Sequence, residues 1–296
     1  MRVRSRILLI SALIVLALVV LVIVQSLSLG TFGGLGASKL RIIFCDVGQG
    51  DAILVITPGG KQILVDGGPG SKAVDCLSQN MPFWDREIEF LVNTHPQQDH
   101  LEGLVAVLAR YKVDMIATTQ VKHETQLFGA WQQAVKTEAA RIYIPRAGDE
   151  LILDSNRGST PKIKILWPSA ASLSKWQAEP PKDLNETSIV MRIDYGLVCA
   201  YLTGDIPKEI LEGIVDKPCQ ILKVAHHGSK TGTSDQVLDK IKPQIAVIQA
   251  GKKNRFGHPH KEVVDLLESH HIQILRNDLN GTVEVYSDGK SFSIKN

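Results

Sequence analysis

The first part of the sequence has no acidic residue, because no Asp or Glu precedes Asp46. Three arginines occur within residues 1–6, and an apolar run interrupted only by Ser11 follows over residues 7–24. A helix of that length spans about 27 Å, close to the hydrocarbon thickness of a bilayer. The run also lacks the polar face that a helix packed on a protein core would show. We therefore expect residues 7–24 to be a transmembrane anchor.

A cleavable leader is the alternative, with residues 36–38 (Gly-Ala-Ser) as a cleavage site. Its apolar region would exceed the roughly 7–15 residues that are typical of signal peptides. In both cases the arginines of residues 1–6 are expected to stay in the cytoplasm, which sends the rest of the chain across the membrane. Residues 25–38, rich in Ser and Gly, are expected to form a flexible linker. The sequence thus predicts a single-pass protein of the cell membrane, with residues 39–296 as one extracytoplasmic domain.

A surplus of positive charge is also lacking once residues 1–6 are set aside. The chain has 33 Lys and Arg against 31 Asp and Glu, and three of the basic residues lie in that segment. The remaining 30 basic and 31 acidic residues leave a net charge of −1. Composition therefore indicates no general nucleic-acid-binding surface, although a local basic patch is compatible with it.

Cysteine is scarce, and the spacing of the four cysteines matches neither a zinc knuckle nor a redox pair. Cys45 and Cys199 lie in strand-like apolar runs, where a small buried thiol is expected. Cys76 and Cys219 complete the set. Disulfides are compatible with an exported domain, but spacing assigns no pairing.

No internal repeat of solenoid length occurs, and from Lys39 onward short apolar strands alternate with helical stretches. Helices are predicted over residues 71–79, 101–111, 234–241 and 261–269. Strands are predicted over residues 40–44, 52–56, 62–65, 90–93, 115–118, 141–144, 163–167, 188–194, 198–203, 221–224, 245–249, 282–286 and 291–294. A Ser/Pro/Lys-rich loop is predicted over Ser169–Asp183. Paired strands mixed with strand–helix units favour an α/β sandwich over a purely parallel sheet.

Five of the predicted strands end in loops that carry titratable or glycine residues. In an open sheet such loops gather along one edge, where α/β folds place their sites. Histidine and carboxylate side chains together suit zinc, manganese or iron, so the sequence predicts a metal centre at this edge. The loop residues are Asp66, His95, Asp99, His100, Asp205, His226, His227, Gly251 and His258.

Other roles compete for some of the polar residues. Asp99 is placed to cap the helix that is predicted to begin near Leu101. The adjacent His226 and His227 follow a strand without helical periodicity, which is unusual for core residues. Histidines on helical or surface-like segments are expected to be solvated, and these are His123, His260, His270 and His271.

Several short motifs occur in an order that matches one known family. They are FCDVGQGDA at residues 44–52, LVDGG at 64–68, THP at 94–96, DHLEGL at 99–104, LTGD at 202–205, LKVAHHGSK at 222–230 and GHP at 257–259. This order resembles the metallo-β-lactamase superfamily, and more specifically the soluble domain of ComEC-type competence proteins, which take up DNA. Cell-wall choline-phosphate esterases share part of it. The resemblance implies a four-layered αββα sandwich for residues 39–296, and the transmembrane helix that the apolar run predicts over residues 7–24 would precede it.

The resemblance also implies a role for each motif residue. The metal ligands are expected to be His95, Asp99, His100, Asp205 and His227, with His226 as the rival of His227. The catalytic residues are expected to be Asp46, Asp66, His226 and His258, of which Asp66 orients the histidine loop. The substrate-binding residues are expected to be Gln49, Asp51, Ser229 and Lys230.

The chain departs from the family pattern at two ligand positions. Gln97 stands where relatives usually carry a second histidine, or in this branch often an aspartate, and an amide oxygen is a poor metal ligand. No histidine fills the middle ligand position, for which Asn185 is the nearest candidate, with a turn residue as the equal interpretation. We therefore expect one or two divalent ions per chain, with zinc as the metal and manganese as the alternative.

The expected activity is hydrolysis of a phosphodiester, with DNA as the substrate. A metal-bound hydroxide would be the nucleophile, because zinc lowers the pKa of its water to about 7. Two alternatives remain: a non-catalytic DNA-binding component of an uptake machine, motivated by Gln97, and a cell-wall choline-phosphate esterase. ComEC-type channels have many membrane spans, whereas this chain shows one apolar run. The chain is therefore expected to work beside a separate multi-span channel.

Overall fold

The computed structural model describes residues 39–152, 154 and 160–295, together with Leu16, Val19 and Val20, which are helical. The rest of the predicted anchor, the linker and the alternative cleavage site lie outside these residues. Among the described residues, we find no helix with the length and apolar character that a membrane span requires. Residues Ser38–Asn296 form one compact unit.

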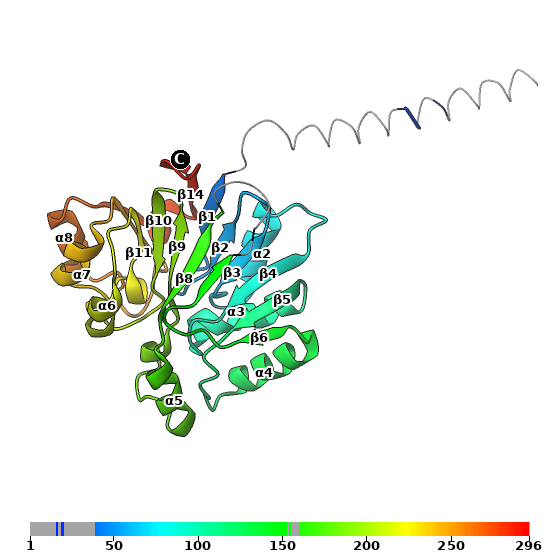
Figure 1. Cartoon of the computed structure of the whole chain (residues 1–296), viewed down its shortest axis with the longest axis horizontal. Helices are drawn as coiled ribbons and strands as arrows, with labels where there is room; N and C mark the ends of the chain where they lie inside the picture. Colours follow the sequence, from blue (N-terminus) through cyan, green and yellow to red (C-terminus); the bar gives the residue numbers. More distant parts are fainter. Residues whose placement is uncertain (1–15, 17–18, 21–38, 153, 155–159, 296) are drawn as a thin grey trace, which may run out of the picture. The chain divides into compact units, whose positions relative to one another are not determined.

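Two sheets make up this unit (Figure 1). The strands of the first sheet are β1 (Leu40–Phe44), β2 (Ile53–Ile56), β3 (Gln62–Val65), β4 (Glu87–Val92), β5 (Lys112–Ala117), β6 (Arg141–Tyr143), β14 (Val283–Ser287) and β15 (Phe292–Lys295). Those of the second sheet are β7 (Glu150–Ile152), β8 (Lys162–Trp167), β9 (Val190–Tyr195), β10 (Val198–Leu202), β11 (Ile221–Lys223), β12 (Ile245–Ile248) and β13 (Gln273–Arg276). The strand orders are β15-β14-β1-β2-β3-β4-β5-β6 and β13-β12-β11-β10-β9-β8-β7.

Helices cover the outer faces of both sheets. The first sheet packs against α2 (Lys72–Asn80), α3 (Gln98–Leu108) and α4 (Gln126–Glu138). The second sheet packs against α6 (Lys208–Ile214), α7 (Asp235–Ile241) and α8 (Lys261–Ser269). The remaining helical segments are α5 (Ala170–Ala178), η1 (Leu184–Thr187), η2 (Ala225–Gly228) and α9 (Asn277–Asn280). The predicted αββα sandwich is confirmed.

The alternation of side chains along the strands explains why both faces of each sheet are buried. In β1, Leu40 and Phe44 pack between the sheets, whereas Ile43 packs toward the helices of the first sheet. In β10, Ala200 packs between the sheets and Tyr201 toward the second set of helices. Successive side chains of a strand point to opposite faces, so a strand covered on both sides is apolar throughout.

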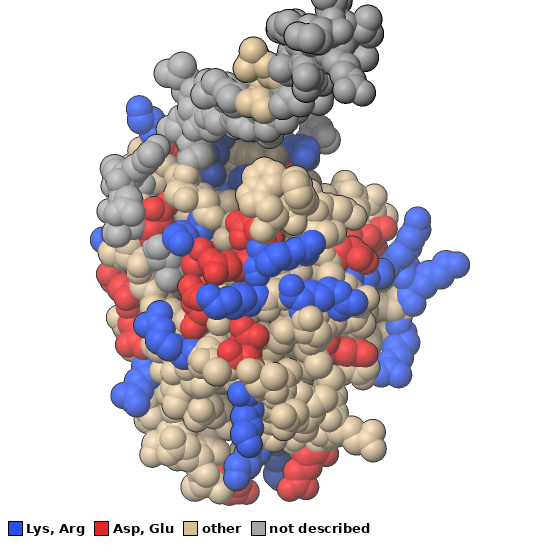
Figure 2. Space-filling model, turned by 90° about the vertical axis from the view of Figure 1, so that its right-hand side faces the viewer, with Lys and Arg blue, Asp and Glu red and all other residues tan. Residues whose placement is uncertain are grey.

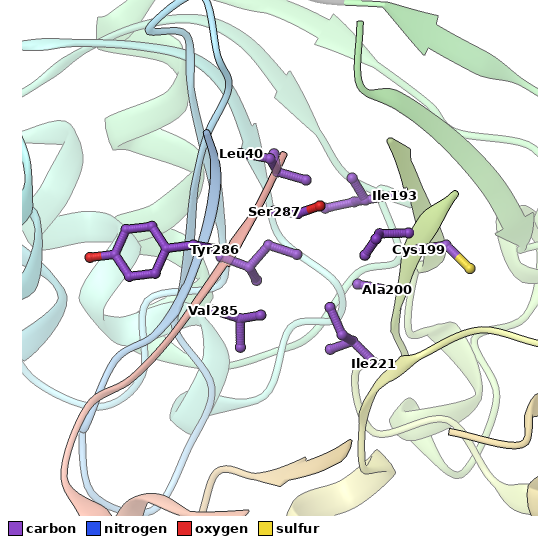
Figure 3. A pocket seen from close by; sticks show the side chains of 10 residues that line it. Leu40, Ile193, Cys199, Ala200, Ile221, Val285, Tyr286 and Ser287 are labelled. Carbon is purple, nitrogen blue, oxygen red and sulfur yellow. The ribbon is translucent and has the colours of Figure 1, made fainter. Parts of the chain in front are cut away.

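The space between the sheets is closed rather than a binding pocket. Figure 3 shows Leu40 and Val285 of the first sheet near Ile193, Ala200 and Ile221 of the second. The gap that these side chains line leaves no room for a water molecule. This apolar interior therefore holds the two sheets together and does not contribute to a site.

The predicted loop that begins at Ser169 is wrong, because Ala170–Ala178 form α5. The Ser169 hydroxyl accepts a hydrogen bond from the Ser172 backbone N–H and so caps the helix. Leu173 and Trp176 are then buried in a small separate core. Further elements that the sequence pattern did not indicate are α4, α6, β7 and β13.

The expectation of free thiols at Cys45 and Cys199 is also wrong. Cys45 is disulfide-bonded to Cys76 across a Cα–Cα distance of 6.0 Å, and Cys199 to Cys219 across 5.3 Å. Each bond joins a strand-end cysteine to a neighbouring segment, a proximity that spacing along the chain does not reveal.

We predict that no cysteine of residues 39–296 reacts with an alkylating reagent under denaturing conditions without reductant. The Cys45–Cys76 bond closes a sequence separation of 31 residues. On chain entropy, replacing both by Ala should lower the free energy of unfolding by about 3–4 kcal/mol. Intact mass measures the first effect and denaturant unfolding the second. Labelled cysteines in the unreduced protein would contradict this pairing.

Candidate metal centre

The loops that carry the predicted polar residues meet at one edge of the sandwich. In the first sheet β3 and β4 are parallel, so Asp66 and His95 follow strands that end side by side. In the second sheet β10, β11 and β12 are parallel, so Asp205 and His227 likewise follow neighbouring strand ends. The two sheets contribute to one centre, because His100 Nε2 of the first lies 3.3 Å from Asp205 Oδ2 of the second.

Asp66 orients the loop that follows β4. Its Oδ1 accepts a hydrogen bond from the Thr94 backbone N–H at 2.8 Å, and its Oδ2 one from the Thr94 hydroxyl at 2.6 Å. His100 Nδ1 donates to the same Oδ2 at 2.7 Å. With Nδ1 engaged in this way, the Nε2 atom of His100 is turned toward Asp205.

His227 is held in a similar way from the second sheet. Its Nδ1 donates to the backbone oxygen of Gln249 at 2.9 Å and lies 3.2 Å from Asp51 Oδ1. Its Nε2 lies 3.2 Å from Asp99 Oδ2 and 3.1 Å from Asp205 Oδ2. His227, rather than its rival His226, therefore joins the cluster of donor atoms.

Three residues of the centre adopt left-handed backbone conformations. The φ angles of Asp66, His226 and His227 are 58°, 52° and 54°. Such angles are uncommon for residues other than Gly, and they persist where surrounding structure enforces them. The His226–His227 turn thus directs two imidazoles to different places: His227 into the cluster and His226 into the adjoining cleft.

Four side chains offer donor atoms to one point. One oxygen or nitrogen from each of Asp99, His100, Asp205 and His227 lies within 4.8 Å of all the others. Within the described part of the chain, both Asp205 carboxylate oxygens and the Nε2 atoms of His100 and His227 are buried and make no hydrogen bond. Unpaired buried polar atoms are costly, and a divalent ion would satisfy all of them. The donor set therefore fits a transition metal.

The charges in this cluster stabilise one another. Burial by itself would raise the pKa of Asp205, but His227, His100 and Lys223 hold that pKa well below its usual value. Burial would lower the pKa of His227 and of His100, but Asp205 raises both well above the usual value. Without a metal, protons thus occupy the imidazoles, and a bound metal must displace them.

Lys223 is a functional residue that the sequence analysis missed. It is fully buried at the end of β11 and forms an ion pair with Asp51. Its Nζ also donates to the backbone oxygen of Gly204 at 2.8 Å and lies 3.5 Å from Asp205 Oδ1. A lysine in an otherwise apolar strand was the available signal, because such a charge requires a buried partner.

His95 lies beside the cluster but outside the four-donor set. It is fully buried, and its Nδ1 lies 3.0 Å from the Thr94 hydroxyl oxygen and 3.4 Å from that of Ser188. Its Nε2 makes no hydrogen bond among the described residues. Burial and then His100 lower its pKa to about 3, so His95 is neutral.

Asp51 and Asp46, which the sequence analysis expected to bind or act on substrate, do not line the cleft described below. Asp51, expected to bind substrate, is 1% exposed and contacts Lys223 and His227 from behind. Asp46, expected to be catalytic, is exposed, and its carboxylate accepts a hydrogen bond from the Gly48 N–H. Asp51 thus supports the centre from behind and Asp46 stabilises a turn, while the substrate-binding role of Asp51 and the catalytic role of Asp46 stay predictions.

Two further predicted residues lie in the turn after the histidine pair. The hydroxyl of Ser229 is buried and lies 3.0 Å from that of Thr231. The backbone N–H of Lys230 donates to His260 Nδ1 at 3.1 Å, and its side chain is exposed. Neither is among the residues that line the cleft described next.

A cleft of about 570 Å³ opens beside the cluster. Asp99, His226 and His227 form part of its wall. His226 Nε2 lies 3.9 Å from Asp205 Oδ2, and the Nδ1 atom of His258 lies 3.4 Å from the side-chain nitrogen of Gln49. Other residues of the wall are Gln49, Gln97, His123, Arg255, Phe256 and His258. His123, expected to be solvated, thus faces this cleft.

One loop of the cleft wall was not singled out by the sequence analysis. Asn254 holds it by accepting from the backbone N–H groups of Phe256 and His258 at 3.2 and 2.9 Å. The ring of Phe256 is 49% exposed and stacks on that of His258 with a centroid distance of 5.7 Å. The guanidinium of Arg255 lies 5.0 Å from the centre of the Phe256 ring.

Known proteins share both sequence and fold with this chain. It is 29% identical to the ComE operon protein 3 of Bacillus subtilis (strain 168) over 274 residues, 84% of this chain and 33% of that protein. It is 27% identical to Recombination protein 2 of Haemophilus influenzae over 247 residues, 81% of this chain and 28% of that protein. The chain therefore spans well under two thirds of the length of these curated relatives.

A solved structure gives the same fold. The metallo-beta-lactamase fold protein YhfI from Bacillus subtilis matches with a TM-score of 0.52 at 12% identity, over 83% of this chain and 99% of that one. A sequence model of the Metallo-beta-lactamase superfamily matches residues 45–252. Because that match extends over most of the compact unit, the chain belongs to the metallo-beta-lactamase superfamily.

Proposed function

We propose that this protein is a metal-dependent phosphodiesterase that acts on nucleic acid outside the cytoplasm. The observation that carries this proposal is the convergence of Asp99, His100, Asp205 and His227 at the wall of an open cleft. The similarity to competence-related proteins supports nucleic acid as the substrate class.

The protein's own residues prepare the donor atoms. Asp66 and the Gln249 carbonyl bind the Nδ1–H groups of His100 and His227, which leaves both Nε2 lone pairs free for an ion. A divalent ion held there would polarise a phosphoryl oxygen and lower the pKa of a water molecule. Lys223 balances the charge of Asp51 behind this set. His226 and His258 line the cleft, where their rings can contact a phosphate or its leaving oxygen.

The cleft wall favours a nucleotide over a simple phosphate. Arg255 supplies a positive charge for a backbone phosphate, and its guanidinium, the exposed Phe256 ring and the His258 ring form a stack of flat groups that a base can extend. Figure 2 shows one face of the molecule, on which Lys and Arg are interspersed with Asp and Glu. We therefore assign nucleic-acid contact to the cleft.

A cell-wall choline-phosphate ester fits this wall less well. An aromatic ring can hold a quaternary ammonium group by its π face. Here the guanidinium of Arg255 already lies over the Phe256 ring, and its positive charge would repel choline. The remaining alternative, a DNA-binding component without turnover, is motivated by Gln97, which lines the cleft where relatives usually carry a ligand.

Export of the domain has independent support. All four cysteines are paired in two disulfides, which is typical of proteins outside the reducing cytosol. The predicted anchor, with the arginines of residues 1–6 on its cytoplasmic side, also predicts that the domain lies outside the cytoplasm. A separate multi-span channel is the partner that we propose for DNA uptake.

We predict that Asp205→Asn abolishes both metal binding and hydrolysis. The amide removes the negative charge that lies closest to the Nε2 atoms of His100 and His227. Metal content by elemental analysis should fall to background, and phosphodiesterase activity should fall by more than about 100-fold. Asp75→Asn is the matched control, because Asp75 is exposed on α2, which carries none of the donor residues, and it should retain both. A folded Asp205→Asn protein with undiminished turnover would refute the proposal.

We also predict that Phe256→Ala weakens binding of single-stranded DNA in the presence of EDTA by about 1–3 kcal/mol, or roughly 5- to 150-fold. An abasic oligonucleotide of the same length should bind equally to the variant and to the wild type, since it has no base to stack. Arg255→Ala should weaken the binding of both oligonucleotides and make that binding less dependent on salt concentration. Fluorescence anisotropy measures the affinities of the wild type and of both variants for each oligonucleotide. Equal losses for both ligands with Phe256→Ala would exclude stacking.

A further inference from the structure

Three large apolar side chains are exposed on loops away from the metal centre. Phe83 and Trp84 lie between α2 and β4 and are 81% and 66% exposed. Their rings meet edge to face with a centroid distance of 4.8 Å. Leu197, in the turn between β9 and β10, is 76% exposed. Such side chains on a soluble surface lose favourable burial unless something covers them.

Both loops flank the start of β1. Arg41 donates to Oδ1 of Asn80 at 3.2 Å, at the end of the helix that leads into Phe83. The Leu197 N–H donates to the Gly289 oxygen at 2.7 Å, in the turn after β14, whose Ser287 pairs with Leu40. Figure 1 shows β1 beside β2 and near β14. The two exposed loops therefore belong to one edge of the sandwich.

The metal centre lies at the opposite edge. β1 ends at Phe44 and continues into the loop that carries Asp51, which contacts His227. The backbone oxygen of Phe44 also accepts a hydrogen bond from Asn277, at the start of α9. α9 carries Leu279, another large apolar side chain, which is 70% exposed. β1 thus runs from the edge that carries Phe83 and Trp84 to the edge that carries the metal centre.

The edge with Phe83 and Trp84 is also the one nearest the predicted anchor along the chain. β1 is preceded by Lys39, and only residues 25–38 separate it from the apolar run 7–24. A chain of that length reaches at most about 50 Å. An anchor formed by residues 7–24 would therefore keep the start of β1 within that distance of the bilayer.

We propose that Phe83, Trp84 and Leu197 insert into the interfacial layer of the membrane that holds residues 7–24, provided that these residues anchor the chain. Aromatic rings favour the headgroup region of a bilayer. The exposed charged side chains of the same edge are of both signs, with Lys39, Arg86 and Lys290 beside Glu87 and Asp288, so the apolar side chains carry the docking. Because the anchor would tether the domain to the membrane, docking is an intramolecular step, and three apolar contacts are enough to hold the docked state. The docked domain presents its metal centre away from the membrane, toward incoming substrate.

Tryptophan fluorescence of the full-length chain in vesicles tests this orientation. Of the four tryptophans, Trp131 and Trp176 are 3% and 6% exposed, and Trp167 is partly buried with its indole N–H bonded to the Glu186 oxygen. Trp84 is therefore the one that a brominated acyl chain can reach. In phosphatidylcholine–phosphatidylglycerol vesicles with brominated lipid, we expect quenching in the wild type that is lost in Trp84→Phe.

Leu279 provides the matched control. In the Trp84→Phe background, Leu279→Trp places an exposed indole at the opposite edge, and we expect no quenching there. Leu197→Ser should reduce the quenching of Trp84, whereas Leu279→Ser should leave it unchanged. These results would support the proposed docking edge.

Three outcomes would overturn the inference. Flotation with the vesicles but equal quenching of wild type and Trp84→Phe would refute docking while leaving the anchor intact. Failure of the full chain to float with vesicles would refute the anchor and the docking together, without bearing on hydrolysis. A Trp84 emission that depends on protein concentration and not on bromolipid would assign this edge to contact between two copies.

Discussion

The burial of several charged groups at one point is the constraint on which this site depends. Asp51, Asp205, His100 and His227 are all nearly inaccessible to water, and an uncompensated buried charge costs several kcal/mol. Lys223 compensates part of this charge from the floor of the second sheet. The remaining unpaired donor atoms face one another, so a cation is the group that completes the balance. The attraction between these buried charges therefore stabilises the centre, and the donor atoms that it leaves unpaired can bind a metal ion.

The fold brings these charges together from two sheets. Parallel strand ends place Asp66 and His95 beside each other in the first sheet, and Asp205 and His227 in the second. The apolar core between the sheets fixes the distance across which His100 meets Asp205. β1 links this centre to the opposite edge, where the chain continues toward its predicted anchor. Packing thus determines both the geometry of the centre and the direction in which it opens.

The sequence predicted the layered fold and the main cluster because both depend on local patterns. Apolar runs marked the strands, and polar residues such as Asp66 and Asp205 stood directly at strand ends. Contacts between distant segments were not predictable in this way. Lys223 looked like one polar residue in a strand because Asp51, its partner, comes from the other sheet. Asp51 itself shares a motif with Gln49, yet Asp51 is buried behind the centre and Gln49 lines the cleft. The disulfide pairs and α5, whose apolar side chains form a separate small core, likewise required the three-dimensional structure.

The most direct test of this account is an anomalous diffraction measurement at the zinc edge, on crystals of residues 39–296 grown with zinc. The account predicts a peak among Asp99, His100, Asp205 and His227, within about 2.0–2.2 Å of the His100 and His227 Nε2 atoms and an Asp205 oxygen. It also predicts that the hydrogen bonds from His100 to Asp66 and from His227 to the backbone oxygen of Gln249 persist. The absence of a peak at this cluster, or a zinc ion bound elsewhere while these side chains keep their protons, would contradict the central claim.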